Sequence, residues 1–475
     1  MRKTSKILIG LFITALWSTE TLAGTYLPPD SILNHYISIA LKSNITLTRK
    51  TLSYRQSLAA LREVKRSFLP TLSFNATYST AEGQNPLGIN TGETIGSFTQ
   101  NLDLINSTLA QLAPSYPSIP PYSTDESTAL NQLLNQNQQT FLRLAVPIFN
   151  AAVIRNQALQ KELIEVSQLD SDDYKDELVK EVKLAYFQWL QAGELVNVYQ
   201  NALQLAEENV RTNRSLFQNA KVTKDVYLSA QARRAEVIQQ LTKARKDQVL
   251  AQAFFNFLLN RSYNTVIIRE EPSDALNPPT QPIDTYQAIA LENRKDLKQV
   301  RQFQEVKQAQ MHLQKSNYLP QASLALDAGY RGTEYVFNNE NDFVALSAQL
   351  KWDIYTFGKN EAKVQQAKID QQVARTEEQA LLQNITIEVV KAYLEIEAAY
   401  EGYQFALQEV TVSTQELRLV KRKYELGQVN RLTLEDVETD YQNAQLRVLA
   451  SKYNILKQKA QLERVTSSYV YEDED

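Results

Sequence analysis

The sequence predicts a mixed α/β membrane protein in which one unit, helix–strand–strand–long helical hairpin, occurs twice. Two observations predict this fold. Segments of the first half return in the same order in the second half, and each half passes from alternating apolar and polar residues into a long block without proline. Alternation is the pattern of a strand, and the blocks are rich in strong helix formers. We therefore expect four strands and two long helical hairpins.

The internal duplication is carried by two collinear sets of residues. Tyr36 opens a segment, YISIALKSNITL, that resembles YQAIALENRKDL from Tyr286, at a shift of 250 residues. Glu181 opens EVKLAYF, which resembles EVVKAYL from Glu388, at a shift of 207 residues. The smaller second shift indicates an insertion in the first half, ahead of Glu181.

The first residues have the pattern of a secretory signal peptide. Arg2, Lys3 and Lys6 precede the apolar run Ile7–Trp17, and small residues lie before a cleavage point after Ala23. The apolar run is too short to span a bilayer, so we expect a cleaved signal rather than an anchor. The chain should be exported, and no other apolar run is long enough for a transmembrane helix.

The repeat divides the chain into expected parts. The first repeat covers 24–260 after the signal peptide at 1–23, with strands at about 70–80 and 141–149, a surface loop at 81–140 and a hairpin at 153–260. A linker at 261–285 leads to the second repeat at 286–468, with strands at about 321–330 and 345–355 and a hairpin at 359–468, before an acidic tail at 469–475. The loop, in which Phe98–Leu112 could form a short helix, is interpreted as a lid or as a mobile surface segment.

The predicted strands have one apolar and one polar face. Pro70 and Pro320 end the preceding helices, because proline cannot continue a helix. Strands of about ten residues with an apolar face and aromatic ends are typical of membrane β-barrels, and a soluble sheet with one wet face is the alternative. We expect four aromatic residues to lie at the membrane interfaces: Tyr78, Tyr330, Trp352 and Tyr355.

Four strands cannot close a barrel, and an open sheet edge in lipid leaves unpaired backbone groups that cost several kcal/mol each. The chain must therefore oligomerise if these are membrane strands. Two copies would give eight strands, whose interior is filled by side chains, whereas three copies would give twelve strands around a lumen. The small polar residues on the inner face favour three.

Each helical block should bend once, at 217–225 in the first half and at 424–432 in the second. Gly427 is suited to the left-handed conformation that ends many helices. Ala220 stands in its place in the first half, where we expect Asn219 to adopt the positive φ instead.

Composition argues against several classes of function. The chain has no cysteine, two histidines and a net charge of −4, without a basic run. No phosphate-binding glycine loop, zinc motif or nucleophile elbow is present. We therefore expect no enzyme, no metal, no cofactor and no nucleic-acid partner.

The order of these elements, with the motifs ALENRKDL, YLPQASL and YELGQVNRLTLEDVETDYQNAQ, resembles the TolC-like outer membrane efflux protein family, also called outer membrane factors, across the mature chain. The resemblance implies a homotrimer with a twelve-stranded β-barrel in the outer membrane of Gram-negative bacteria, surrounded by lipid, continuous with an α-helical barrel in the periplasm. It further implies an exit channel for drug efflux or type I secretion, which conducts cargo passively and docks to a periplasmic adaptor (membrane fusion) protein and an inner-membrane pump of the RND or ABC type. A periplasm-spanning coiled-coil scaffold without a pore is the alternative.

The resemblance also implies a gate at the hairpin turns. The two acidic positions of the family's constriction fall on Asp436 and Thr433, of which only Asp436 is acidic, and Asp225 lies near the matching turn. The alternative is that these acids are ordinary solvated residues. The adaptor-contact tip would comprise Tyr424, Gly427, Val429, Phe217 and Val222. The family's gate arginine is replaced by Val429, with Arg431 nearby.

Overall fold

A computed structural model describes residues 32–80, 136–270, 276–332 and 336–469, together with Leu102, Leu104, Ile105 and Ser107. The expected signal peptide, most of the 81–140 loop, the rest of its Phe98–Leu112 helix and nearly all of the acidic tail lie outside these residues.

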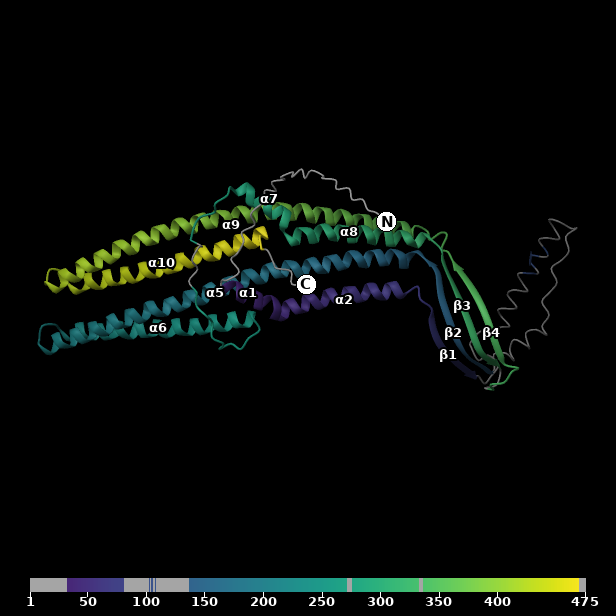
Figure 1. Ribbon diagram of the computed structural model, residues 1–475, viewed down its shortest axis with the longest axis horizontal. Coiled ribbons are helices and arrows are strands. Elements are labelled where there is room, and N and C mark those ends of the chain that lie inside the picture. The colour runs from purple at the N-terminus through teal and green to yellow at the C-terminus, as the bar shows by residue number, and fades with distance from the viewer. Residues whose placement is uncertain are drawn as a thin grey trace, which may run out of the picture. The chain divides into compact units, whose positions relative to one another are not determined.

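The described elements confirm the duplicated fold (Figure 1). The first repeat comprises α1 (Ile32–Ser43), α2 (Ile45–Arg66), β1 (Thr71–Thr80), β2 (Gln136–Asn150), α5 (Ala151–Gln218) and α6 (Lys224–Leu258). The second comprises α7 (Ile283–Asn293), α8 (Lys295–Lys315), a short 3-10 turn (Ser316–Tyr318), β3 (Gln321–Gly332), β4 (Asp342–Lys351), α9 (Lys359–Glu425) and α10 (Arg431–Thr466). The long helices match in length, with 68 and 67 residues in α5 and α9.

The four strands form one antiparallel sheet in the order β1-β2-β3-β4. The register aligns apolar residues across all four strands, as in the row Leu72, Leu144, Leu326 and Leu346. The next row is polar on three strands and small on the fourth, with Ser73, Arg143, Asp327 and Ala345. Arg143 donates to both carboxylate oxygens of Asp327 at 2.7 and 2.8 Å. The sheet therefore has the expected apolar and polar faces.

Three strand boundaries differ clearly from the sequence prediction, the smallest of these differences being the start of β4 at Asp342 rather than at about 345. β2 begins at Gln136 rather than at about 141, because Gln136–Thr140 continue the pairing with β1. β4 ends at Lys351, so Trp352, Ile354 and Tyr355 follow the strand instead of finishing it. Lys351 pairs with Gln321, and the next partner along would be Pro320, which has no N–H to continue the ladder.

The turn from β4 into α9 uses left-handed backbone at two successive residues. Phe357 has a φ of 48° and Gly358 a φ of 83°. No heavy atom lies within 4 Å of a Cβ built on Gly358, so its role is conformational rather than steric. In the first repeat, the side chain of Asn150 accepts hydrogen bonds from the backbone N–H groups of Ala152 and Val153 and so caps α5 directly.

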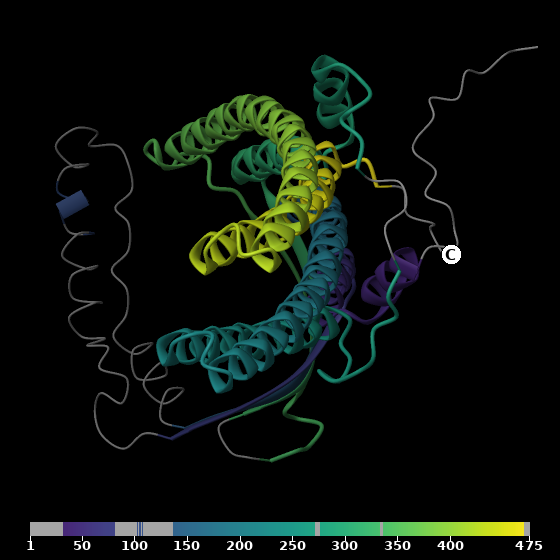
Figure 2. The same ribbon diagram turned by 90° about the vertical axis from the view of Figure 1, so that its left-hand side faces the viewer.

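The described residues form two compact units: the first comprises those within 32–54, 167–301 and 376–469, and the second those within 55–166 and 302–375. The first unit holds both hairpin tips, and Figures 1 and 2 show α5 beside α6 and α9 beside α10. The second unit holds the sheet and the helix ends that adjoin it.

An aromatic cluster fixes the first repeat within the first unit. The edge of the Tyr36 ring meets Phe255 at 5.0 Å between centroids, and Tyr186 lies 5.6 Å from Phe255. The Tyr186 hydroxyl donates to the carbonyl of Ile268 at 3.1 Å and accepts from the N–H of Glu270 at 2.9 Å. Burial raises the pKa of Tyr186 to about 12. These bonds attach the linker after α6 to α5.

A second apolar cluster performs the same task in the second repeat. Ala290 and Leu297, from α7 and α8, pack with Ile385, Val389 and Ile396 of α9 and with Leu462 and Val465 of α10. Four of these side chains have no exposed surface at all. Both hairpins are therefore anchored by the short helices that open their own repeat.

Candidate functional site

The two hairpin turns have the same backbone geometry. In the second hairpin, Gly427 donates to the carbonyl of Tyr424 and Gln428 to that of Lys423, both at 2.9 Å. In the first, Ala220 donates to Phe217 at 3.0 Å and Lys221 to Leu216 at 2.9 Å. This pair of backbone hydrogen bonds caps the C-terminus of both helices and places a left-handed residue at the centre of the turn.

That residue is Ala220 in the first turn, with a φ of 56°, and Gly427 in the second, with a φ of 69°. The expectation that Asn219 would take the positive φ is wrong. Asn219 remains within the helical hydrogen bonding, where its N–H donates to the carbonyl of Ser215 at 3.1 Å and its side-chain amide donates to the same carbonyl at 2.8 Å. The position in the capping pattern, rather than residue type, decides which residue becomes left-handed.

We expect Ala220→Gly to stabilise the first turn by about 0.5–1 kcal/mol, because glycine adopts positive φ without steric cost. Gly427→Ala should destabilise the second turn by a similar amount, since nothing within 4 Å would contact an added Cβ. Hydrogen exchange of the adjoining amides measures both effects. Equal protection in parent and variants would contradict the assignment of strain to these residues.

Thr433 and Asp225 both act at helix starts. The side-chain oxygen of Asn430, the cap of α10, accepts from the N–H of Thr433 at 2.9 Å and from its hydroxyl at 3.0 Å. A hydrogen bond from the Thr223 side chain lowers the pKa of the exposed Asp225 carboxyl, which lies in the first turn of α6. Both side chains are therefore hydrogen-bonded to the N-cap residue of their own helix.

Asp436 differs from these residues because its exposed side chain makes no hydrogen bond or ion pair within the part of the chain that the structure describes. It lies on the first turns of α10, between the buried residues Leu434 and Val437. The Asp436 carboxylate is therefore free to bind water or a cation.

The predicted tip residues lie around the two turns and are half-buried or exposed. The ring of Phe217 stacks on Tyr227 at 6.1 Å with an interplanar angle of 4°, joining α5 to α6. Val222, Tyr424 and Val429 are half-buried, and Gly427 is exposed. Exposed leucines extend this surface: Leu228, Leu426 and Leu432.

Arg431 links the two hairpins. Its guanidinium donates to the carbonyl of Val226 in the first turn of α6 at 2.5 Å and forms an ion pair with Glu435 of its own helix. The Arg431 side chain is 16% exposed, so water competes only weakly for these bonds. The sequence drew attention to Arg431 by its place near the turn, but did not reveal Val226, which lies 205 residues away.

A groove of about 510 Å³ lies between the hairpins, lined by α5, α6 and α10. Arg233 in this groove donates to Glu236 at 2.8 Å and to Gln442 at 3.0 Å. Burial, reinforced by the nearby carboxylate of Glu435, raises the pKa of Glu438. Sequence analysis did not select Glu438, because no local pattern shows that α10 turns it toward the other hairpin.

We expect Glu438→Gln to increase stability at neutral pH. A carboxylic acid whose pKa is raised by folding stabilises the folded state at pH values below its unfolded-state pKa, here 4.5. This stabilisation is lost as the pH rises through the folded-state pKa. The gain from the neutral amide should therefore disappear on acidification toward that value. Thermal unfolding of parent and variant between pH 4 and pH 8 tests this, and a gain independent of pH would contradict it.

The four predicted interface aromatics lie at the two ends of the sheet. Tyr78 is close to the end of β1, and Tyr330 of β3 packs edge-on against Phe337 at 5.2 Å. Trp352 and Tyr355 lie at the opposite end, where the Trp352 indole donates to the carbonyl of Tyr318 at 3.0 Å. Tyr78, Trp352 and Tyr355 are more than half exposed.

Within the described residues, no helix has the length and apolarity needed to cross a membrane, and no cluster of side chains has the composition of a metal site. The described residues offer two features that bear on function: a sheet with one apolar and one polar face, and a pair of helical hairpin tips.

Comparisons with known proteins give a consistent result. Residues 288–468 match the family model described as outer membrane efflux protein. A search of curated proteins finds no match. The Campylobacter jejuni CmeC outer membrane channel aligns with a TM-score of 0.72 at 16% identity, over 99% of this chain and 96% of that one.

Two further solved structures share the fold. The open-state MtrE outer membrane channel of Neisseria gonorrhoeae aligns with a TM-score of 0.65 at 18% identity, over 91% of this chain and 88% of that one. The outer membrane protein VceC of Vibrio cholerae aligns with a TM-score of 0.67 at 16% identity, over 91% and 95%. The resemblance to outer membrane efflux proteins is confirmed: the chain has the fold of these outer-membrane channels, and residues 288–468 carry the outer membrane efflux protein domain.

Proposed function

We propose that three copies of this chain form an outer-membrane exit channel through which an export assembly releases its cargo. Their strands would close a twelve-stranded barrel, and their hairpins would form the periplasmic duct. The observation that carries the proposal is the apolar face of the sheet. Its large side chains face no other part of the described chain, with exposed fractions of 69% for Leu72, 76% for Val344 and 74% for Leu346.

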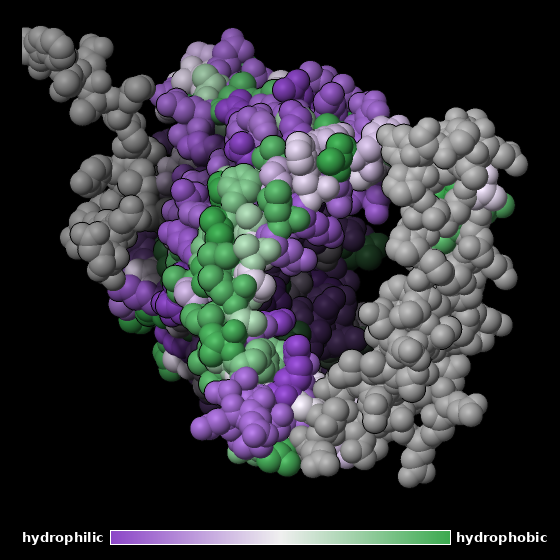
Figure 3. Space-filling model, turned by 90° about the vertical axis from the view of Figure 1, so that its right-hand side faces the viewer, coloured by the Kyte–Doolittle hydropathy of each residue, from purple (hydrophilic) through white to green (hydrophobic). Residues whose placement is uncertain are grey.

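Lipid is the environment that this sheet requires. Figure 3 shows an apolar stripe along the strand end of the molecule. The strands have 10 to 15 residues, a length suited to a membrane strand. β1 and β4 are open edges of the sheet, and open edges are not stable in lipid, so neighbouring copies must pair with them.

The polar face supports a water-filled interior. Arg143 and Asp327 form a fork-shaped ion pair on this face, together with Ser73 on the neighbouring strand. Charges placed this way are stable in a hydrated lumen and would be costly toward lipid. A twelve-stranded barrel is wide enough to hold such a lumen.

The hairpin tips are the surface on which a periplasmic adaptor would dock and through which an inner-membrane RND or ABC pump would deliver cargo. The exposed leucines and the Phe217–Tyr227 pair at the tips favour an apolar contact. On this proposal the channel is passive, and the pump supplies the energy. Co-purification of the adaptor and pump with the tagged chain, and its loss on tip substitution, would identify the assembly.

Planar-bilayer recording of the purified chain, with native mass spectrometry of its oligomer, tests the proposal. We expect trimers and discrete conductance steps. A periplasmic scaffold of the same helices would give no conductance, and that result, or a stable monomer in detergent, would overturn the channel.

Asp436 is proposed to form an acidic ring at the constriction, one carboxylate from each copy. Such a ring attracts cations, so we expect Asp436→Asn to lower cation selectivity and to weaken block by divalent ions. Glu416→Gln, which neutralises an exposed acid further along the hairpin, is the matched control. Single-channel recordings with unchanged selectivity and block in the Asp436 variant would assign this residue to the solvated surface.

A further inference from the structure

Three helix–strand junctions bring cations together at one end of the sheet. α2 leads into β1, α8 leads into β3, and β4 leads out to α9. Gln321, the first residue of β3, pairs with Lys351, the last residue of β4. Thr71, the first residue of β1, pairs with Ala145, which is near the end of β2. Because β2 also pairs with β3, all of these junctions adjoin the same end.

Five exposed cations lie at these junctions, and we call them the junction cations: Arg62, Lys65, Arg66, Lys315 and Lys359. The same stretches contain only two acids, Glu63 and Asp353. In the part of the chain that the structure describes, none of the five forms an ion pair, whereas half of the arginines in the hairpin helices do. A local excess of cations is notable in a chain whose net charge is −4.

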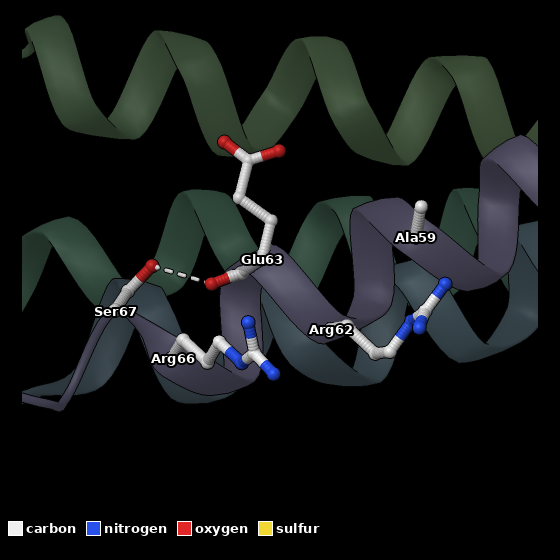
Figure 4. Close-up of a pocket in the computed structure, with 5 residues that line it drawn as sticks. All are labelled: Ala59, Arg62, Glu63, Arg66 and Ser67. Atoms are coloured by element: carbon white, nitrogen blue, oxygen red, sulfur yellow. Dashed lines mark hydrogen bonds between the residues drawn. The ribbon is translucent and has the colours of Figure 1, made fainter.

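The end of α2 shows how these cations are arranged. Arg62 and Arg66 are one helical turn apart and border a shallow hollow of about 480 Å³ (Figure 4). Figure 4 shows the Glu63 side chain extending to the other side of the helix, so it does not lie between the two guanidinium groups. Like charges four residues apart repel each other, and an anion from outside the chain would remove that repulsion. Guanidinium groups bind phosphate through paired N–H donors.

Aromatic and apolar residues adjoin the junction cations. Trp352, Tyr355 and Phe357, between Lys351 and Lys359, are 54%, 73% and 89% exposed, and Ile354 is 77% exposed. Beyond them extends the apolar face of the sheet. Cations, then exposed aromatics, then apolar surface is the order found where a protein crosses from the headgroups to the hydrocarbon of a bilayer.

We propose that the junction cations bind the phosphate groups of anionic phospholipids in the leaflet that meets this end of the sheet. The inference rests on the proposed function, because it requires the apolar face to lie in a membrane. It adds a lipid preference that a barrel held only by its apolar surface would lack. The occupant must carry a net negative charge, since a zwitterionic headgroup brings its own cation.

Native mass spectrometry of the full-length oligomer, titrated in detergent with phosphatidylglycerol or with phosphatidylcholine, tests this. We expect tighter binding of phosphatidylglycerol. Arg62→Gln, Lys65→Gln and Arg66→Gln together should lower that affinity on the order of 100-fold, because each cation near an anionic headgroup contributes about a factor of five. Phosphatidylcholine binding should not change.

The control variant removes the same charges elsewhere: Arg211→Gln, Lys243→Gln and Arg245→Gln, all exposed on the first hairpin. It should retain the preference for phosphatidylglycerol. Equal binding of the two lipids by the parent, or an undiminished preference in the Arg62 triple variant, would overturn the proposal. If the triple variant does not assemble, titration of the parent in about 1 M salt decides, since screening over about 3 Å must abolish a preference that is electrostatic.

Conductance in a bilayer of phosphatidylcholine alone separates this inference from the channel itself. A parent chain that conducts there without any preference for phosphatidylglycerol disproves only the lipid site. A parent chain that conducts in no bilayer disproves the channel.

Discussion

Replacement of Arg464 by methionine should destabilise the junction of α5 and α10 by about 3 kcal/mol, because it leaves carboxylates without their cation in a poorly hydrated place. The Arg464 guanidinium donates to Asp173 at 2.9 Å and to Glu177 at 3.0 Å, and its side chain is 12% exposed. Asp176, next in the same cluster, is fully buried and accepts a hydrogen bond from the Ser467 hydroxyl.

Hydrogen exchange of the amides at the end of α10 would measure the loss as roughly 100-fold faster exchange, since 1.4 kcal/mol corresponds to a factor of ten. Arg422→Met is the matched control. Arg422 also pairs with a glutamate, but it is 74% exposed, and an exposed pair contributes at most about 1 kcal/mol. Similar exchange in both variants would show that Arg464 does not hold the two helices together.

The effect of Arg464→Met should also depend on pH. Burial raises the pKa of Asp173, and the neighbouring carboxylates of Asp296 and Asp176 add to that rise, while Arg464 opposes it. Without Arg464, protonation of Asp173 relieves the uncompensated charge. The deficit of the variant should therefore shrink as the pH falls from neutral toward 4.

The parts of the fold that sequence could predict are those with local signals. Pro70 and Pro320 end helices, alternation indicates strands, and Gly427 ends α9. Each of these signals acts through the local backbone and does not depend on tertiary contacts. The end of β4 could not be found in this way, because it depends on the missing N–H of Pro320, the residue just before the partner strand β3. The choice of Ala220 over Asn219 likewise depends on the frame of the capping hydrogen bonds.

The candidate site was less predictable than the fold because its contacts join distant segments. Asp436 and Thr433 were expected from the family resemblance, and Asp225 from its place near the matching turn, but the local hydrogen bonds of Thr433 to Asn430 and of Asp225 to Thr223 could not be read from the sequence. The burial of Glu438 and the bond from Arg431 to Val226 arise between hairpins that are far apart in sequence. Only their packing reveals them.

Arg431→Gln should increase the conductance of the channel. The Arg431 guanidinium ties the start of α10 to the Val226 carbonyl at the start of α6, so it holds the two hairpin tips of one chain together. A charge-assisted hydrogen bond of this kind contributes about 1.5–3 kcal/mol, which corresponds to a shift of roughly 10-fold to 100-fold in the balance between closed and open tips. Three such links in a trimer would make opening cooperative.

Glu435→Gln separates the two roles of this arginine. It removes the ion pair within α10 but leaves the N–H groups of Arg431 free to bind Val226, so it should change conductance less than Arg431→Gln does. Arg422→Gln, also near the tip but without a contact to the other hairpin among the described residues, should leave conductance unchanged. Single-channel recordings distinguish these outcomes. Equal conductance in the parent and the Arg431 variant would mean that the Arg431–Val226 hydrogen bond stabilises the hairpins without restricting the pore. A larger effect of Glu435→Gln than of Arg431→Gln would mean that the Arg431–Glu435 ion pair, and not the hydrogen bond, restricts the pore.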